Sequence, residues 1–169
     1  MKKTKNSKNV MPKNFKYWSG EEISKPDPKK HENCILVVGS NPTGWHGAGL
    51  ALIAKTYWGA IQRQGRGLSG KSYLLPTKNL SKNFYEKQTG ITYSRTGFRS
   101  ISSTQIRTNI VELYEVALSM PEKWFIVPYR RFDRNLNGYS ADFMFELFTK
   151  DIQVPRNVVF HESWKGYYY

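Results

Sequence analysis

The order of apolar and polar segments predicts an α/β layer fold. Short apolar runs that are typical of buried strands alternate with segments of helical periodicity. Two loops, at 41–49 and 133–140, each follow an apolar run and precede a helical segment. A chain of 169 residues is long enough for one core and too short for two. We therefore expect one domain over 31–169, preceded by a basic segment at 1–30.

Four apolar runs predict the strands, at 34–38, 72–75, 124–129 and 157–160. Pro76 closes the second run, because proline has no N–H to donate to a neighbouring strand. The single cysteine, Cys34, lies in the first run. We expect a buried thiol, no internal disulfide and a reducing, cytoplasmic compartment.

Three segments predict helices, at 50–57, 105–119 and 140–150. In the third, Ser140 is expected to cap the N-terminus, and Asp142 lies in the first turn, where a carboxylate is favoured. Residues 79–103 are polar, rich in Ser, Thr and Gly, and predict no particular element. The second helix should bury the apolar side chains that recur at helical spacing: Ile106, Ile110, Leu113, Tyr114, Ala117 and Leu118.

The formal net charge is +13, which favours acidic partners such as nucleic acid or phosphorylated ligands. Residues 1–30 carry nine lysines against three carboxylates, a net charge of +6, and the remaining +7 lies on 31–169. An ordinary solvated basic surface has the same composition. Residues 1–14 are expected to be disordered, and the aromatic cluster Phe15, Tyr17 and Trp18 to hold the following segment on the domain.

Several classes of protein are not indicated by this sequence. No apolar run approaches the length of a membrane span, and the lysine-rich N-terminus lacks the apolar region of a signal peptide. His31, His46, His161 and Cys34 do not have the spacing of metal ligands. We expect no membrane contact, no metal and no cofactor.

The loop after the first strand has the composition of a phosphate-binding loop. It contains Gly39, Gly44, Gly47 and Gly49, and a helix is expected to begin at its end. Glycines let the backbone approach a ligand, and the first N–H groups of a helix are unpaired and attract anions. Asn41 can donate to and accept from a ribose hydroxyl, although asparagine there also stabilises turns.

The second loop, at 133–140, stands in the same position relative to the strand at 124–129. Ligands of open α/β sheets bind beyond the carboxyl ends of the strands. We therefore expect the two loops to hold a diphosphate from both sides.

Residues 65–72 match the Walker A pattern G-x-x-x-x-G-K-[ST] letter for letter. That pattern holds phosphate only between a buried strand and a helix. Here no core strand precedes it, and the strand-like run before Pro76 follows it. We reject a P-loop for this segment.

Five blocks of sequence support a family resemblance. They are Gly39-Ser-Asn41, Gly44-x-His46-Gly-Ala-Gly49-x-Ala51, Tyr57-x-Gly-Ala-Ile61, Gln64-Gly-x-Gly-Leu-x-Gly-x-Ser-Tyr73 and Leu75-Pro-Thr-Lys78. In these blocks the chain resembles the phage and bacterial macrodomain-like proteins. A looser resemblance covers 124–164, and residues 1–30 are not covered. The resemblance implies a three-layer fold with a central mixed sheet flanked by helices, and a ligand of the ADP-ribose type.

The resemblance also implies roles for individual residues. Asn41 would contact the distal ribose, the amides of 47–49 would bind the diphosphate, and 136–139 would form the second phosphate loop. The complete set of expected ligand-binding residues is Asn41, Gly44, Gly47, Ala48, Gly49, Leu136, Asn137, Gly138 and Tyr139.

Catalysis is a further implication of the resemblance. Lys55 matches a lysine that attacks the anomeric carbon in macrodomain hydrolases, which remove ADP-ribose from nucleic acid or acidic side chains. The assisting aspartate corresponds to Asn137, whose amide cannot act as a base, so Asp133 or Asp142 would have to replace it. His46 is a second acid–base candidate because of the intrinsic pKa of imidazole.

Each of these side chains also has a structural interpretation. A helical lysine is commonly just exposed, and a loop histidine is commonly a hydrogen-bonded structural residue. Three functions therefore stay open: an ADP-ribosyl hydrolase using Lys55, His46 and Asp133, a nucleotide binder without turnover, and a basic nucleic-acid-binding protein.

Overall fold

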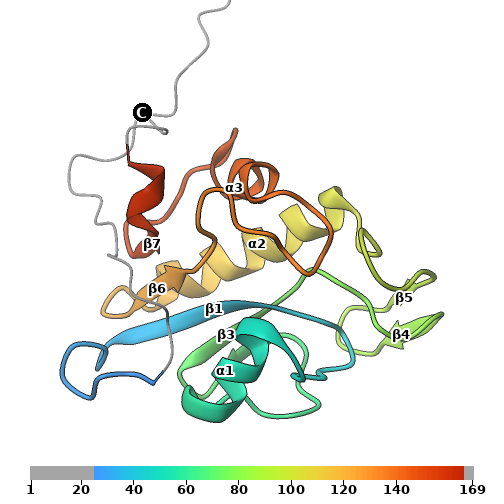
Figure 1. Ribbon diagram of the computed structural model, residues 1–169, viewed down its shortest axis with the longest axis horizontal. Helices are drawn as coiled ribbons and strands as arrows, with labels where there is room; N and C mark the ends of the chain where they lie inside the picture. Colours follow the sequence, from blue (N-terminus) through green and yellow to red (C-terminus); the bar gives the residue numbers. More distant parts are fainter. Residues whose placement is uncertain (1–24, 166–169) are drawn as a thin grey trace, which may run out of the picture.

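The computed structural model describes residues 25–165, which form a five-stranded mixed sheet with helices on both faces (Figure 1). The strand order is β2-β3-β1-β6-β7. The strands are β1 (Cys34–Ser40), β2 (Gly67–Ser69), β3 (Ser72–Pro76), β6 (Trp124–Val127) and β7 (Val158–Phe160). All neighbours pair in parallel except β2, which pairs antiparallel with β3. The predicted α/β class is confirmed.

Three α-helices cover the sheet: α1 (Gly49–Tyr57), α2 (Ser103–Ser119) and α3 (Ala141–Thr149), and a 3-10 helix, η1 (Glu162–Trp164), follows β7. Leu36 and Val38 of β1 pack in one apolar cluster with Ala54 and Trp58 at α1. The alternate residues of β1 face the other side and belong to the cluster that includes α2 and α3. Both faces of the sheet are covered, which explains the uninterrupted apolar run of β1.

Aromatic side chains supply much of the core between α3 and the end of the chain. The ring of Phe145 stacks on Trp164 with centroids 4.0 Å apart, and Phe160 meets Phe145 edge-on at 5.0 Å. The indole N–H of Trp164 donates to the carbonyl oxygen of Tyr129 at 2.7 Å. This bond fixes the backbone just where the chain leaves β6 toward the second predicted loop.

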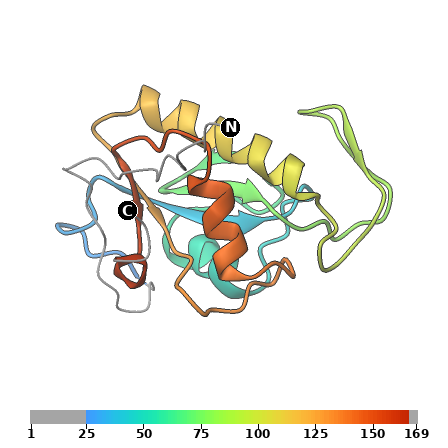
Figure 2. The same ribbon diagram turned by 90° about the horizontal axis from the view of Figure 1, so that it is seen from above.

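Strands β3, β1 and β6 are parallel neighbours, so their carboxyl ends lie along one edge of the sheet, which we call the carboxyl edge. The loops that leave this edge are 77–83, 41–48 and 128–140. A hairpin of β4 (Phe84–Glu86) and β5 (Ile91–Tyr93) follows the first of them and projects past the start of α2 (Figure 2).

All seven strands and helices expected from the sequence are present, with boundaries shifted by one or two residues. The predicted cap is confirmed, because Ser140 Oγ accepts a hydrogen bond from the Phe143 amide at 3.1 Å and Asp142 lies in the first turn. Two burial predictions are wrong. Cys34 is only half-buried because it begins β1, and Leu118 is 66% exposed because the buried stripe of α2 ends at Ala117.

The sequence did not reveal β2, β4 and β5. Strand β2 lies inside the Walker-like segment, and Gly70 and Lys71 form the turn between β2 and β3. Lys71 Nζ donates to the carbonyl oxygen of His31 at 2.7 Å. A hairpin therefore stands where a P-loop needs a helix, which agrees with the rejection of that motif.

Some predictions concern residues outside 25–165. They are the disorder of 1–14 and the role of Phe15, Tyr17 and Trp18. In the part of the chain that the structure describes, no helix combines the length and the hydropathy of a membrane span.

Candidate functional site

The structure brings the two predicted loops together at the carboxyl edge. The first loop leaves β1 and the second leaves β6, and these strands are hydrogen-bonded neighbours. A Cβ atom added to Gly49, where α1 begins, would lie 3.2 Å from Leu136 Cδ1 of the second loop. Leu136 is 58% exposed, so it forms a surface contact between the loops and leaves the start of α1 accessible.

The N-terminus of α1 differs from those of the other two helices. Its N-cap residue, Ala48, makes no side-chain cap hydrogen bond, and the first turn contains no acidic residue. By contrast, Ser102 and Ser140 cap α2 and α3. Gly47, Ala48 and Gly49 are all exposed, so the backbone that leads into α1 and the first residue of the helix lie at the surface. This end of the helix has the positive potential of a helix dipole without a carboxylate to neutralise it.

The first loop is held in shape by the segment 61–66. The Arg63 amide donates to the carbonyl oxygen of Gly44 at 2.8 Å, and Ser40 Oγ donates to that of Gly65 at 2.5 Å. Gly44 has φ +73°, and a Cβ there would collide with the backbone of residues 63 and 64. The predicted role of Gly44 in ligand binding stays a prediction, and its observed role is close packing that gives the loop one conformation before any ligand arrives.

Asn41 is buried and bonds within its own loop. Its Nδ2 donates to the carbonyl oxygen of Trp45 at 2.7 Å, and its Oδ1 accepts from Thr43 Oγ1 at 2.6 Å and from the Trp45 amide at 3.0 Å. The structure thus shows the turn-stabilising role of Asn41. Its contact with a ribose stays a prediction.

His46 is fully buried, and its ring joins the first loop to the segment 61–66. Nε2 lies 3.1 Å from the carbonyl oxygen of Ile61 and 2.8 Å from that of Gln64. Two carbonyl partners require a proton on Nε2, which leaves Nδ1 of the neutral ring as an acceptor. Nδ1 is buried and has no hydrogen-bond partner within residues 25–165. The geometry gives His46 a structural role and restricts substrate access to its basic nitrogen.

The second loop is shaped by its own polar side chains. Asn137 is buried, where its Oδ1 accepts from the Tyr139 amide at 3.0 Å and its Nδ2 lies 3.4 Å from Met144 Sδ. The Tyr139 hydroxyl donates to the carbonyl oxygen of Ile101 at 2.7 Å. Gly138 has φ +85° and packs against Phe98. Asn137 and Tyr139 therefore fix the loop, and Leu136 is the member of this group that faces α1.

The predicted catalytic residues are not gathered at the contact between the loops. Lys55 is exposed in the last turn of α1, six residues beyond Gly49 and so about 9 Å further along the helix axis. The helix ends near the opposite edge of the sheet, where the Lys71 amide donates to the carbonyl oxygen of Trp58. Asp133 is exposed in the second loop.

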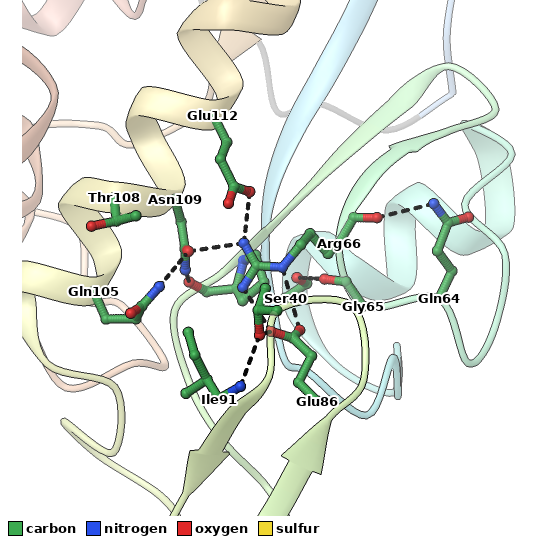
Figure 3. Close-up of polar contacts among 12 residues, drawn as sticks. Ser40, Gln64, Gly65, Arg66, Glu86, Ile91, Gln105, Thr108, Asn109 and Glu112 are labelled. Atoms are coloured by element: carbon green, nitrogen blue, oxygen red, sulfur yellow. Dashed lines mark hydrogen bonds and ion pairs between the residues drawn. The ribbon is translucent and has the colours of Figure 1, made fainter.

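A buried ion cluster beneath the first loop was not foreseen from the sequence (Figure 3). The guanidinium of Arg66 pairs with Glu86 at 3.0 Å and with Glu112 at 2.8 Å, and it donates to Asn109 Oδ1 at 2.9 Å. Asn109 Nδ2 in turn donates to the carbonyl oxygen of Pro76 at 2.8 Å. The cluster thus ties the segment 61–66 to β4, to α2 and to the end of β3.

Burial opposes the charge of Arg66, but the hydrogen bond and charge of Glu86, with those of Glu112, outweigh burial and raise the pKa of the guanidinium. The Arg66 and Glu86 side chains are only 4% and 6% exposed, so water does not screen this pair. The Glu112 side chain is 40% exposed, so water screens its charge and it raises the pKa of Arg66 less than Glu86 does. Because the donors are consumed within the cluster, we assign it a structural role.

A depression of about 480 Å³ lies beside this cluster, between the segment 61–66 and β4. Its lining includes Pro42 of the first loop, Arg63, Tyr85 and Lys87. It is separate from the contact between Gly49 and Leu136. Within residues 25–165, no group of three His, Cys, Asp or Glu side chains is placed to hold a metal ion.

Comparison with family models, with curated proteins and with solved structures finds no match to this chain.

Replacing Arg66 tests the ion cluster. Arg66→Met should lower the free energy of unfolding by about 3–5 kcal/mol, because it leaves buried Glu86 without its counter-charge. Urea unfolding monitored by tryptophan fluorescence measures this change. Arg63→Met, at an exposed position of the same segment, should change stability by less than about 0.5 kcal/mol. Equal effects of the two substitutions would contradict the structural role of the cluster.

The cluster also predicts how stability changes at alkaline pH. Burial and then the charge of Glu86 raise the pKa of Tyr93 to about 12, above the ordinary value near 10. The unfolded chain therefore ionises first, so this stabilisation is complete below about pH 10 and is lost as the pH rises toward 12. Tyr93→Phe should make the decline in unfolding free energy above pH 10 shallower, by up to about 1 kcal/mol per pH unit.

Unfolding at pH 9, 10 and 11 (a range set by the ordinary tyrosine pKa of about 10) measures this slope. Tyr85→Phe is the matched control, since Tyr85 is 56% exposed on the same hairpin. Identical slopes for the wild-type protein and Tyr93→Phe would rule out the assignment.

Proposed function

We propose that this protein binds a nucleotide of the ADP-ribose type, with the diphosphate lying at the carboxyl edge against the N-terminus of α1. The observation that carries the proposal is the uncapped start of α1, whose exposed residues 47–49 adjoin the second loop through Leu136. Exposed, unpaired amides at a helix N-terminus bind phosphate oxygens, and a glycine-rich approach lets the ligand come close. The position beyond the carboxyl ends of parallel strands is the usual ligand site of such sheets.

The macrodomain-like fold is part of the same proposal. The mixed sheet, the helices on both of its faces and the order of the blocks quoted above support it. The first loop, which its internal hydrogen bonds hold in shape, also supports nucleotide binding, because a preformed loop loses little conformational entropy when a ligand binds.

Binding without turnover is the form of this function that the geometry favours. Lys55 lies about 9 Å along α1 from the proposed phosphate site, and its reach toward a ribose there is limited. Asn137 supplies a buried amide that bonds inside the second loop, in place of a carboxylate. The proposed role is therefore to hold a nucleotide.

Ala48→Asp separates ligand binding from folding. Ala48 is exposed and has φ −151° and ψ 160°, the extended conformation of an N-cap. An aspartate there should leave the fold intact, because a carboxylate is favourable near a helix N-terminus, while its negative charge repels a diphosphate. Titration calorimetry with ADP-ribose should show binding to the wild-type protein and at least about tenfold weaker binding to the variant.

Ser102→Asp is the matched control, because it adds the same charge at the cap of α2 and should leave the affinity unchanged. An absence of ADP-ribose binding by the wild-type protein at millimolar ligand would refute the proposal. Equal affinities of wild type and Ala48→Asp would refute the placement at α1.

Lys55→Ala tests binding against hydrolysis. We expect wild type and variant to bind ADP-ribose equally and both to leave ADP-ribosylated DNA and protein intact after long incubation, as followed by chromatography. Release of ADP-ribose by the wild-type protein and not by Lys55→Ala would instead establish a hydrolase with a catalytic lysine.

A further inference from the structure

The carboxyl edge carries a strong excess of positive charge beside the proposed nucleotide site. The segments 76–83, 94–100 and 128–139 contain seven cationic residues and one carboxylate, Asp133. The cations are Lys78, Lys82, Arg95, Arg99, Arg130, Arg131 and Arg134. The first and third segments leave the carboxyl ends of β3 and β6, which flank β1 in the sheet, and the second segment is hydrogen-bonded to both of them. The charge is therefore gathered along one edge.

An exposed aromatic side chain lies within this basic surface. Phe98 is 72% exposed, and Lys78 Nζ lies 5.3 Å from the centroid of its ring. The guanidinium of Arg99 lies 5.5 Å from the centroid of the Tyr139 ring. An aromatic face bordered by cations is the combination that proteins present to a nucleobase and its phosphates.

The backbone holds Phe98 in a defined place. The Gly97 amide donates to the carbonyl oxygen of Asn79 at 2.9 Å, and the Arg99 amide donates to that of Asn137 at 2.7 Å. Arg99 Nε also donates to the carbonyl oxygen of Gly138 at 3.1 Å, and Arg99 has φ +56°, a conformation that few non-glycine residues adopt. The turn therefore holds the Phe98 ring in a defined place at the surface.

Phe98 and the proposed nucleotide site are connected by the second loop. It packs against Gly138, and Leu136, two residues earlier in the same loop, meets Gly49 at the start of α1. A ligand that leaves the amides of 47–49 along the second loop would therefore reach Phe98.

We propose that this face binds single-stranded nucleic acid, with one base stacked on Phe98 and the adjoining phosphates bound by Lys78, Arg95 and Arg99. One end of this nucleic acid would lie at the proposed nucleotide site, and that placement rests on the proposed function. The binding of the rest of the nucleic acid rests on Phe98 and the neighbouring cations. A duplex hides the faces of its bases, and an acidic protein surface does not require an aromatic face. Single strands are therefore the ligand that matches both features.

Fluorescence anisotropy of a short labelled oligothymidine with the full chain tests the proposal. Phe98→Ala should weaken binding about tenfold, the usual effect of losing one stacked base, and the same strand in a duplex should be insensitive to this change. Tyr57→Ala is the matched control, because Tyr57 is 47% exposed at the far end of α1. Both variants should unfold like the wild-type protein.

Lys78→Ala tests the contribution of positive charge to oligothymidine binding. Lys123→Ala, at the opposite edge of the sheet, is its control. Lys78→Ala should weaken oligothymidine binding and make its salt dependence shallower by about one released ion, whereas Lys123→Ala should change neither. Unchanged oligothymidine binding by Phe98→Ala, or by Lys78→Ala, would overturn the proposal. Dependence on Phe98 for anionic phospholipid vesicles and not for the oligonucleotide would overturn it as well.

The two proposals fail independently. If Phe98→Ala weakens oligothymidine binding while calorimetry shows no ADP-ribose binding, the proposed nucleic-acid surface around Phe98 is supported and the proposed nucleotide site is refuted. If Ala48→Asp abolishes ADP-ribose binding while Phe98→Ala leaves oligothymidine binding unchanged, the proposed nucleotide site is supported and the proposed nucleic-acid surface around Phe98 is refuted.

Discussion

The buried charge of Arg66 is the constraint on which the carboxyl edge depends. A guanidinium out of water must be compensated on all sides, and Glu86, Glu112 and Asn109 supply that compensation from β4 and α2. The three partners come from two elements, so compensating one charge fixes β4 and α2 against the segment 61–66 at once. Asn109 extends the constraint to the last residue of β3 through the carbonyl of Pro76.

The first loop takes its shape from this arrangement. Arg66 holds the segment 61–66, and that segment receives the ring of His46 and the backbone of Gly44. The polar side chains of the loop are thereby used to build it, which leaves backbone amides as the groups presented to a ligand. A site made of backbone amides binds an anion only when the amides are held in place. The segment 61–66, fixed by Arg66, would therefore support the proposed anion site.

Much of the fold could be predicted from the sequence because its signals are local. The runs at 34–38 and 124–129 alternate with helical periodicities, and Ser140 stands three residues before the amide that it caps. The hairpin of β4 and β5 had only a weak signal, Thr89-Gly90 between two three-residue runs that contain Phe84 and Tyr85 on one side and Tyr93 on the other. Arg66 and Glu86 had none, since a buried ion pair between residues twenty positions apart leaves no periodic pattern.

By itself, the sequence determined the α/β order, the two loops that follow strands and the positive charge, since all of these depend on neighbours along the chain. The tertiary structure alone decided which loop residues face solvent. It turned Asn41, His46 and Asn137 inward to hydrogen bonds and left residues 47–49 and Phe98 exposed. The physical reason is that burial and charge compensation depend on contacts between distant segments, which come into existence only when the chain has folded.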